Sequence, residues 1–171
     1  MYRLTFSSAS PYVRKVRLAA YLVKINDQIE LVSAENKSFE DIKSNNPLGK
    51  IPVLMKPNGD CLFDSRVIID YFNRLQGCLV PEKDKDRELV LTRCAMTEGI
   101  IDAALLFVYS NRYAGDSKDP KVYQKWKLFL YSIYRFISVH AIIQWNYPVK
   151  IKKKSAAACR ASLIFKTIIF R

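Results

Sequence analysis

The sequence has little of what a metal site or a dithiol redox site requires. Its 171 residues include one histidine, His140, and four cysteines, Cys61, Cys78, Cys94 and Cys159. No two cysteines form a C-x-x-C pair, and none has zinc-ligand spacing with the histidine. We therefore expect no metal ion, and we interpret the four scattered thiols as reduced, as in a cytoplasmic protein.

Acidic residues are missing from residues 127–171. This segment carries nine of the 28 lysine and arginine residues, and all 16 acids precede it. Of the formal net charge of +12, therefore, +9 lies in this segment and +3 in residues 1–126. Such a charge suits an anionic partner, but no helix-turn-helix, finger or aromatic-stacking motif accompanies it, so we predict no nucleic-acid partner.

The first ten residues lack a basic start followed by an apolar run. A signal peptide is therefore not expected, and the predicted location is the cytoplasm. Half of the residues are apolar, which is enough for a substantial core in one large domain or two small ones.

Residues 1–80 show the apolar spacings of an α/β unit. They predict a β-α-β-α-β-β-α order, with strands at residues 2–6, 29–32, 50–55 and 61–63 and helices at 13–24, 38–44 and 64–76. A parallel crossover followed by an antiparallel hairpin predicts a mixed four-stranded sheet. The candidates for the inner face of the first helix are Val13, Val16, Leu18, Ala20 and Leu22.

The chain after this unit is expected to be helical. Residues 81–86 are polar and charged and are interpreted as a linker. Residues 87–113 have the pattern of a long helix, and a second helix is expected from Val122 through Trp126. We therefore assign residues 87–126 to the start of an all-α domain.

The first of three motifs is the run from Ser10 to Val16, where a loop opens the first helix. Pro11 suits the first turn of a helix. The free N–H groups at a helix start favour an anion and lower the pKa of a thiol placed there. The Ser10 hydroxyl could donate a hydrogen bond to such a thiolate. It could equally be only a helix cap.

The second motif is Asn46 to Leu54, in which Pro52 opens a strand. A proline in an otherwise apolar strand is explained if the Ile51–Pro52 bond is cis, which would turn the Ile51 backbone outward to pair with an extended peptide. An ordinary edge-strand proline is the alternative.

The third motif is Asp64-Ser65-Arg66, at the start of a helix. Its hydroxyl and backbone N–H groups suit a carboxylate, and the Asp64 carboxylate suits an ammonium group. Together they match the amino-acid end of a γ-glutamyl ligand. A simple helix cap is again the alternative.

In their order and separations, the three motifs resemble the N-terminal domain of glutathione S-transferases. The runs 10–16, 46–54 and 62–68 resemble the bacterial branch of that family, which has serine at the first active position. The resemblance covers residues 1–80 and implies a thioredoxin-like fold. Glutaredoxin-type exchange on this fold needs a cysteine at or near position 10, where this chain has serine.

The resemblance also implies roles for individual residues. Ser10 would hydrogen-bond the sulfur of glutathione, and the Ile51 backbone would pair with its cysteinyl unit. Asp64 and Ser65 would hold the γ-glutamyl group, and Lys50 could approach the glycine carboxylate. Family members are usually homodimers, and glutathione is a co-substrate with no further cofactor.

The resemblance weakens after about residue 126. The helical domain is expected to be incomplete, because residues 127–171 lack the family's Ser/Thr-x-x-Asp capping box. This aberrant segment is best interpreted as an eroded or frame-shifted end. A membrane-associating tail and a divergent helical end remain alternatives. We do not expect membrane contact, because Arg135 lies within the apolar run.

The resemblance implies a transferase that joins the glutathione thiolate to a small hydrophobic electrophile, a detoxification reaction. The aberrant end leaves the activity of this form open. It also favours an alternative, a non-catalytic glutathione-binding or protein-interaction module.

Overall fold

The computed structural model describes residues 1–77, 79–82, 84–113 and 124. In this part of the chain, an α/β unit of residues 1–82 is separate from a unit that begins at Asp84. Three expectations from the sequence concern residues that, apart from residue 124, lie outside the described part of the chain. They are the helix from Val122 through Trp126, the assignment of residues 114–126 to an all-α domain, and the aberrant end at residues 127–171.

The α/β unit is built on a mixed four-stranded sheet. Its strands are β1 (Tyr2–Phe6), β2 (Ile29–Ser33), β3 (Val53–Met55) and β4 (Cys61–Leu62), in the spatial order β2-β1-β3-β4. β1 pairs with β2 in parallel, whereas the β1–β3 and β3–β4 pairs are antiparallel. The mixed sheet and the β-α-β-α-β-β-α order are as predicted.

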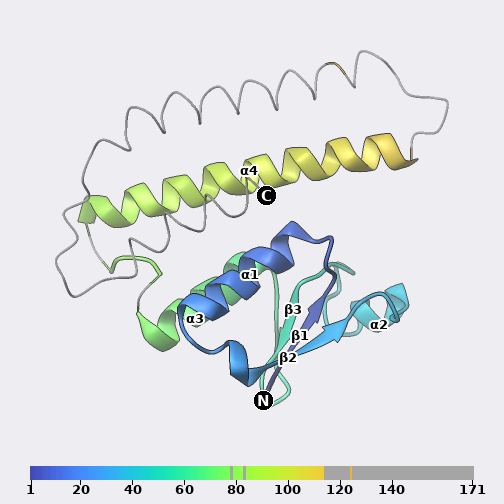
Figure 1. Cartoon of the computed structure of the whole chain (residues 1–171), viewed down its shortest axis with the longest axis horizontal. Coiled ribbons are helices and arrows are strands. Elements are labelled where there is room, and N and C mark those ends of the chain that lie inside the picture. Colours follow the sequence, from blue (N-terminus) through green and yellow to red (C-terminus); the bar gives the residue numbers. More distant parts are fainter. Residues whose placement is uncertain (78, 83, 114–123, 125–171) are drawn as a thin grey trace. The chain divides into compact units, whose positions relative to one another are not determined.

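Three helices and one 3₁₀ turn complete this unit. They are α1 (Pro11–Leu22), η1 (Asn26–Gln28), α2 (Phe39–Lys43) and α3 (Ser65–Gln76). α1 and α3 pack side by side on one face of the sheet, and α2 lies on the other side (Figure 1). α3 begins at the cap Asp64 and ends at Gly77, whose left-handed φ of 64° suits a residue without a Cβ.

The core lies between the sheet and the two packed helices. Its buried residues are Leu4, Val16, Ala19, Ala20, Val23, Ile25, Leu54, Ile68 and Phe72. The prediction for α1 was wrong at Leu18 and Leu22, which are only half-buried, because the buried stripe runs through Ala19 instead. Ala19 and Ala20 belong to the buried core cluster, whereas Leu18 and Leu22 are not among the half-buried side chains that pack against it.

The third strand is shorter than predicted. It begins at Val53 rather than at residue 50, because Pro52 has no N–H to donate to the ladder. Lys50, Ile51 and Pro52 therefore precede the strand, and their backbone is not committed to sheet pairing.

The second unit begins with a single long helix, α4 (Asp84–Tyr113). It starts three residues before the predicted position, within the expected linker. Acidic residues are favourable in a first helical turn, because they interact with the positive end of the helix dipole, and both Asp84 and Asp86 lie in this turn. Ile101 and Ala103 are its buried residues in the described part of the chain.

Candidate functional site

The register of the sheet brings the three motifs to one end of it. Thr5 in β1 pairs with Val53 in β3, and Leu54 in β3 pairs with Leu62 in β4. At this end of the sheet, the chain after β1 leads to Ser10, the chain before β3 contains Pro52, and the chain after β4 reaches Asp64. Segments that are far apart in sequence are thus collected at the ends of adjacent strands.

Ser10 lies at the start of α1, where it is half-buried. Its Oγ accepts a hydrogen bond from the Val13 N–H at 3.3 Å, so it caps the helix. This cap occupies a lone pair of the hydroxyl and leaves its hydrogen available for donation. Capping and donation to a thiolate are therefore compatible roles, and the two alternatives left open by the sequence do not compete.

A compact turn precedes β3, and exposure decreases along the three residues that lead from this turn into the strand. Lys50 is exposed and Ile51 is half-buried, whereas Pro52 is buried, and the Ile51–Pro52 peptide bond is cis. Gly49 has a φ of 61°, and a Cβ there would collide with the Phe39 ring. Glycine is thus required for this turn.

Asp64 and Ser65 begin α3. Asp64 Oδ1 accepts from the Arg66 N–H at 2.9 Å, and the Arg66 guanidinium lies 2.7 Å from Asp64 Oδ2. This guanidinium holds the pKa of the Asp64 carboxyl below its ordinary value. Ser65 is 2% exposed. A ligand ammonium at Asp64 would share the carboxylate with Arg66.

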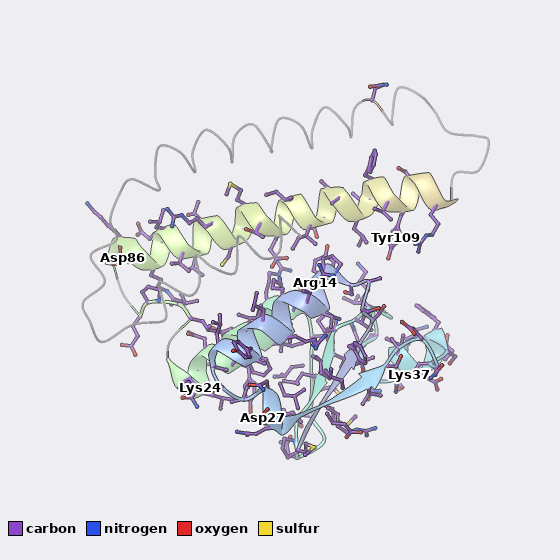
Figure 2. All side chains as sticks on the ribbon, in the orientation of Figure 1. Arg14, Lys24, Asp27, Lys37, Asp86 and Tyr109 are labelled. Carbon is purple, nitrogen blue, oxygen red and sulfur yellow. The ribbon has the colours of Figure 1, made fainter. Side chains whose placement is uncertain are left out.

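Sequence reasoning missed Lys15 and Asn46. The charge of Lys15 also lowers the pKa of Asp64, which links the first turn of α1 to the start of α3. Arg14, the neighbour of Lys15 in the same turn of α1, is exposed (Figure 2). Asn46 is buried and bonded to the turn before β3. An asparagine before proline is a turn signal that could have identified Asn46, whereas no sequence pattern marks Lys15.

These features give the site a positive character. The N-terminal ends of two helices point their partial positive charge at this end of the sheet, and the charges of Lys15 and Arg66 act on Asp64 at the start of α3. The one acid among them, Asp64, is ionised because its pKa is lowered. The arrangement suits a ligand with several anionic groups and one ammonium group.

The ion pair between Asp64 and Arg66 makes a pH-dependent contribution to the free energy of unfolding. Asparagine also caps helices well, so Asp64→Asn removes the charge and keeps the cap. Near neutral pH we expect it to lower the free energy of unfolding by up to ~1 kcal/mol, because the pair is largely exposed. The lowered pKa means that this difference declines below the ordinary carboxyl pKa of 3.8 and is lost below the folded-state pKa.

Urea denaturation of both proteins as a function of pH measures this difference. Asp70→Asn is a matched control, because Asp70 pairs with Arg74 on the same helix but lies away from its first turn. A difference between wild type and Asp64→Asn that grows on acidification would contradict the assigned direction of the pKa shift.

Two other kinds of site are absent from the described residues. No group of histidine, cysteine and acidic side chains there is arranged to hold a metal ion. No helix in that part of the chain is both long and apolar enough to cross a membrane.

Comparison with known proteins identifies the family of the α/β unit. The sequence pattern of the glutathione S-transferase N-terminal domain matches residues 4–82. An uncharacterised GST-like protein of Escherichia coli, YibF, is 30% identical over an alignment of 131 residues, and the match covers 74% of this chain and 64% of YibF. The chain thus spans slightly less than two thirds of this curated relative.

Solved structures agree with the sequence match. A glutathione transferase family member from Pseudomonas fluorescens with bound glutathione superposes with a TM-score of 0.80 at 26% identity. The match covers 100% of this chain and 84% of the Pseudomonas chain. A glutathione S-transferase from Methylobacillus flagellatus, also with glutathione bound, superposes with a TM-score of 0.70 at 31% identity. This match covers 80% of this chain and 68% of the Methylobacillus chain. Through residues 4–82, therefore, the chain belongs to the glutathione S-transferase family and carries its thioredoxin-like N-terminal domain.

Proposed function

We propose that the protein is a glutathione transferase that conjugates the glutathione thiolate to a hydrophobic electrophile. The observation that carries the proposal is the convergence of Ser10, the segment from Lys50 to Pro52, and Asp64-Ser65 at one end of the sheet. The two relatives with bound glutathione support it.

In this proposal each segment takes one part of the tripeptide. Asp64 and Ser65 hold the γ-glutamyl end, where the start of α3 favours its carboxylate. The Ile51 backbone pairs with the cysteinyl unit, and Lys50 attracts the glycine carboxylate. These contacts place the sulfur beside Ser10, whose hydroxyl donates to the thiolate.

The proposed chemistry is a nucleophilic substitution by sulfur at the electrophilic carbon. The thiol loses its proton to solvent, and the thiolate forms a carbon–sulfur bond as the leaving group departs from the electrophile. The protein favours this step by lowering the thiol pKa with the Ser10 hydroxyl and the start of α1, and by holding the two reactants together.

A conjugation assay with a chloronitrobenzene acceptor tests the proposal. We expect conjugate to form faster than the uncatalysed rate and to saturate with glutathione. Glutathione binding measured by calorimetry, without conjugate above the uncatalysed rate, would show a binding module. Absence of binding would reject the glutathione site itself.

Ser65→Ala tests the γ-glutamyl end separately. We expect glutathione affinity to fall by about 1–3 kcal/mol, because a hydrogen bond to a charged carboxylate is removed. Calorimetric titration measures the change. Ser44→Ala serves as the control, because Ser44 is an exposed hydroxyl at the end of α2. Equal dissociation constants for wild type and Ser65→Ala would rule out a carboxylate contact at this hydroxyl.

We also propose that two copies associate, as the apolar exposure of α3 supports. Val67 is 44% and Leu75 is 43% exposed on this helix. Sedimentation equilibrium tests this association, and the mass of one chain at all concentrations would contradict it.

The scattered cysteines support a reducing location, and we propose the cytoplasm. Secretion of the protein into culture medium would contradict this location.

A further inference from the structure

Asn46 is one of two buried polar residues in the described part of the chain, with 2% exposure. Its Nδ2 donates to the Lys50 carbonyl at 2.7 Å, and its Oδ1 accepts from the Leu48 N–H at 3.0 Å. Its own carbonyl accepts from the Gly49 N–H at 2.8 Å. One side chain thus closes the whole turn from residue 46 to residue 50.

The bond to Lys50 fixes more than the turn. The Lys50–Ile51 peptide bond is trans, so its carbonyl and its N–H point in opposite directions. Asn46 holds the carbonyl toward its own buried amide. The Ile51 N–H, in the same rigid plane, is therefore turned away from Asn46.

In the described part of the chain, no other interaction engages the Ile51 N–H. β3 begins only at Val53, so Ile51 does not take part in the ladder with β1. Within the described residues, the Ile51 N–H makes no hydrogen bond. Backbone donors are rarely left unpaired without water or a ligand to receive them.

We propose that Asn46 is a positioning residue that aims the Ile51 N–H at the cysteinyl unit of bound glutathione. This inference rests on the proposed glutathione site and adds a named cause for the direction of its central backbone donor. Asn46 touches no ligand in this account. It acts through the orientation of a single peptide plane.

Calorimetric titration of glutathione into the full chain measures the consequence for affinity. We expect Asn46→Ala to raise the dissociation constant about tenfold, the loss expected for one directed hydrogen bond. Asn45→Ala is the matched control. The adjacent Asn45 carries the same amide, but its Nδ2 donates to the Asp41 carbonyl and Ser44 Oγ, at 3.4 and 3.2 Å, and its Oδ1 accepts from Cys61 Sγ at 3.5 Å. It makes no side-chain bond to the turn before β3. We expect its dissociation constant to stay within twofold of wild type.

A readout at Ile51 separates positioning from a merely structural role. In ¹⁵N-labelled wild-type protein, saturating glutathione is expected to shift the Ile51 amide resonance and slow its hydrogen exchange. In Asn46→Ala at saturation, we expect the Ile51 change to disappear while the Ser65 and Arg66 amides respond as in wild type. General loosening of the fold would instead weaken the responses of all three amides.

Asn46→Asp covers the case in which the alanine variant does not fold. The carboxylate has almost the same shape and still accepts from Leu48, but it repels the Lys50 carbonyl. Near neutral pH it should lose the Ile51 response as Asn46→Ala does. Because a protonated carboxyl can donate to Lys50, acidification should restore part of the response, relative to wild type at the same pH.

The outcomes distinguish this inference from the function on which it rests. If wild-type protein shows no amide response to glutathione at residues 51, 65 and 66, the glutathione site itself is rejected. If wild type responds and the folded Asn46 variants keep both the Ile51 response and the wild-type dissociation constant, the positioning role alone is overturned.

Discussion

Ser10→Ala is expected to raise the pKa of the bound glutathione thiol by about one to two units. A hydrogen bond to a charged group contributes about 1.5–3 kcal/mol, and each pKa unit corresponds to about 1.4 kcal/mol. Loss of the donor disfavours the thiolate, so the pKa rises toward that of a free thiol. Glutathione affinity should change only a few-fold, because the other proposed contacts remain.

The thiolate absorbance of bound glutathione, titrated against pH, measures this shift directly. The conjugation rate of the variant should be about 10–100-fold lower below the wild-type pKa, and the two rates should converge at high pH. A titration curve that Ser10→Ala does not move would contradict the assigned role of the hydroxyl.

The capping role of Ser10 requires its own control. Ser10 Oγ and Ser38 Oγ both cap helices, at 3.3 and 3.1 Å from the capped N–H groups. Loss of either cap should lower the free energy of unfolding by about 1 kcal/mol. Ser38→Ala should nevertheless leave the thiol pKa unchanged. Ser10→Thr keeps a hydroxyl and should retain most of the lowered pKa.

Phe72→Ala is expected to have the largest effect on stability. The Phe72 side chain is fully buried in the core between α3 and the sheet. Its truncation leaves a cavity and should lower the free energy of unfolding of the α/β unit by about 3–5 kcal/mol. α3 also carries Asp64 and Ser65 at its start, so glutathione binding should become unmeasurable once this unit unfolds.

Native-state hydrogen exchange at the Leu4 and Leu54 amides reports on this unit alone, so the long helix α4 does not complicate the measurement. Tyr21→Ala is the matched control, because Tyr21 is an aromatic residue of the neighbouring helix α1 but is 66% exposed. Its cost should be below about 1 kcal/mol. Similar costs for the two variants would contradict the assigned core.

The order of elements in the α/β unit could be predicted because its signals are local. Alternating residues, the Asn58-Gly59 turn and the stop at Gly77 act within a few positions of the chain. The three motifs also lie at element ends that such signals mark. The mixed pairing of the sheet followed from the crossover and the hairpin. The strand order and the register were not predicted, because they depend on contacts between distant strands.

The remaining details depend on contacts between distant segments. Spacing alone could not tell that α1 buries Ala19 and leaves Leu18 half-exposed, because the buried face of α1 depends on its packing against the distant helix α3. The link between Lys15 and Asp64 joins two helices. The role of Asn46 required the position of the Lys50 carbonyl, which only the folded turn defines.

A crystal structure of the full chain with glutathione would show whether the three motifs form one ligand site. We expect one tripeptide at the end of the sheet, with its sulfur within hydrogen-bond distance of Ser10 Oγ, its cysteinyl unit paired with Ile51, and its γ-glutamyl carboxylate at the start of α3. Glutathione bound elsewhere, no bound glutathione at saturating concentration, or a Ser10 side chain turned away from the sulfur would contradict it.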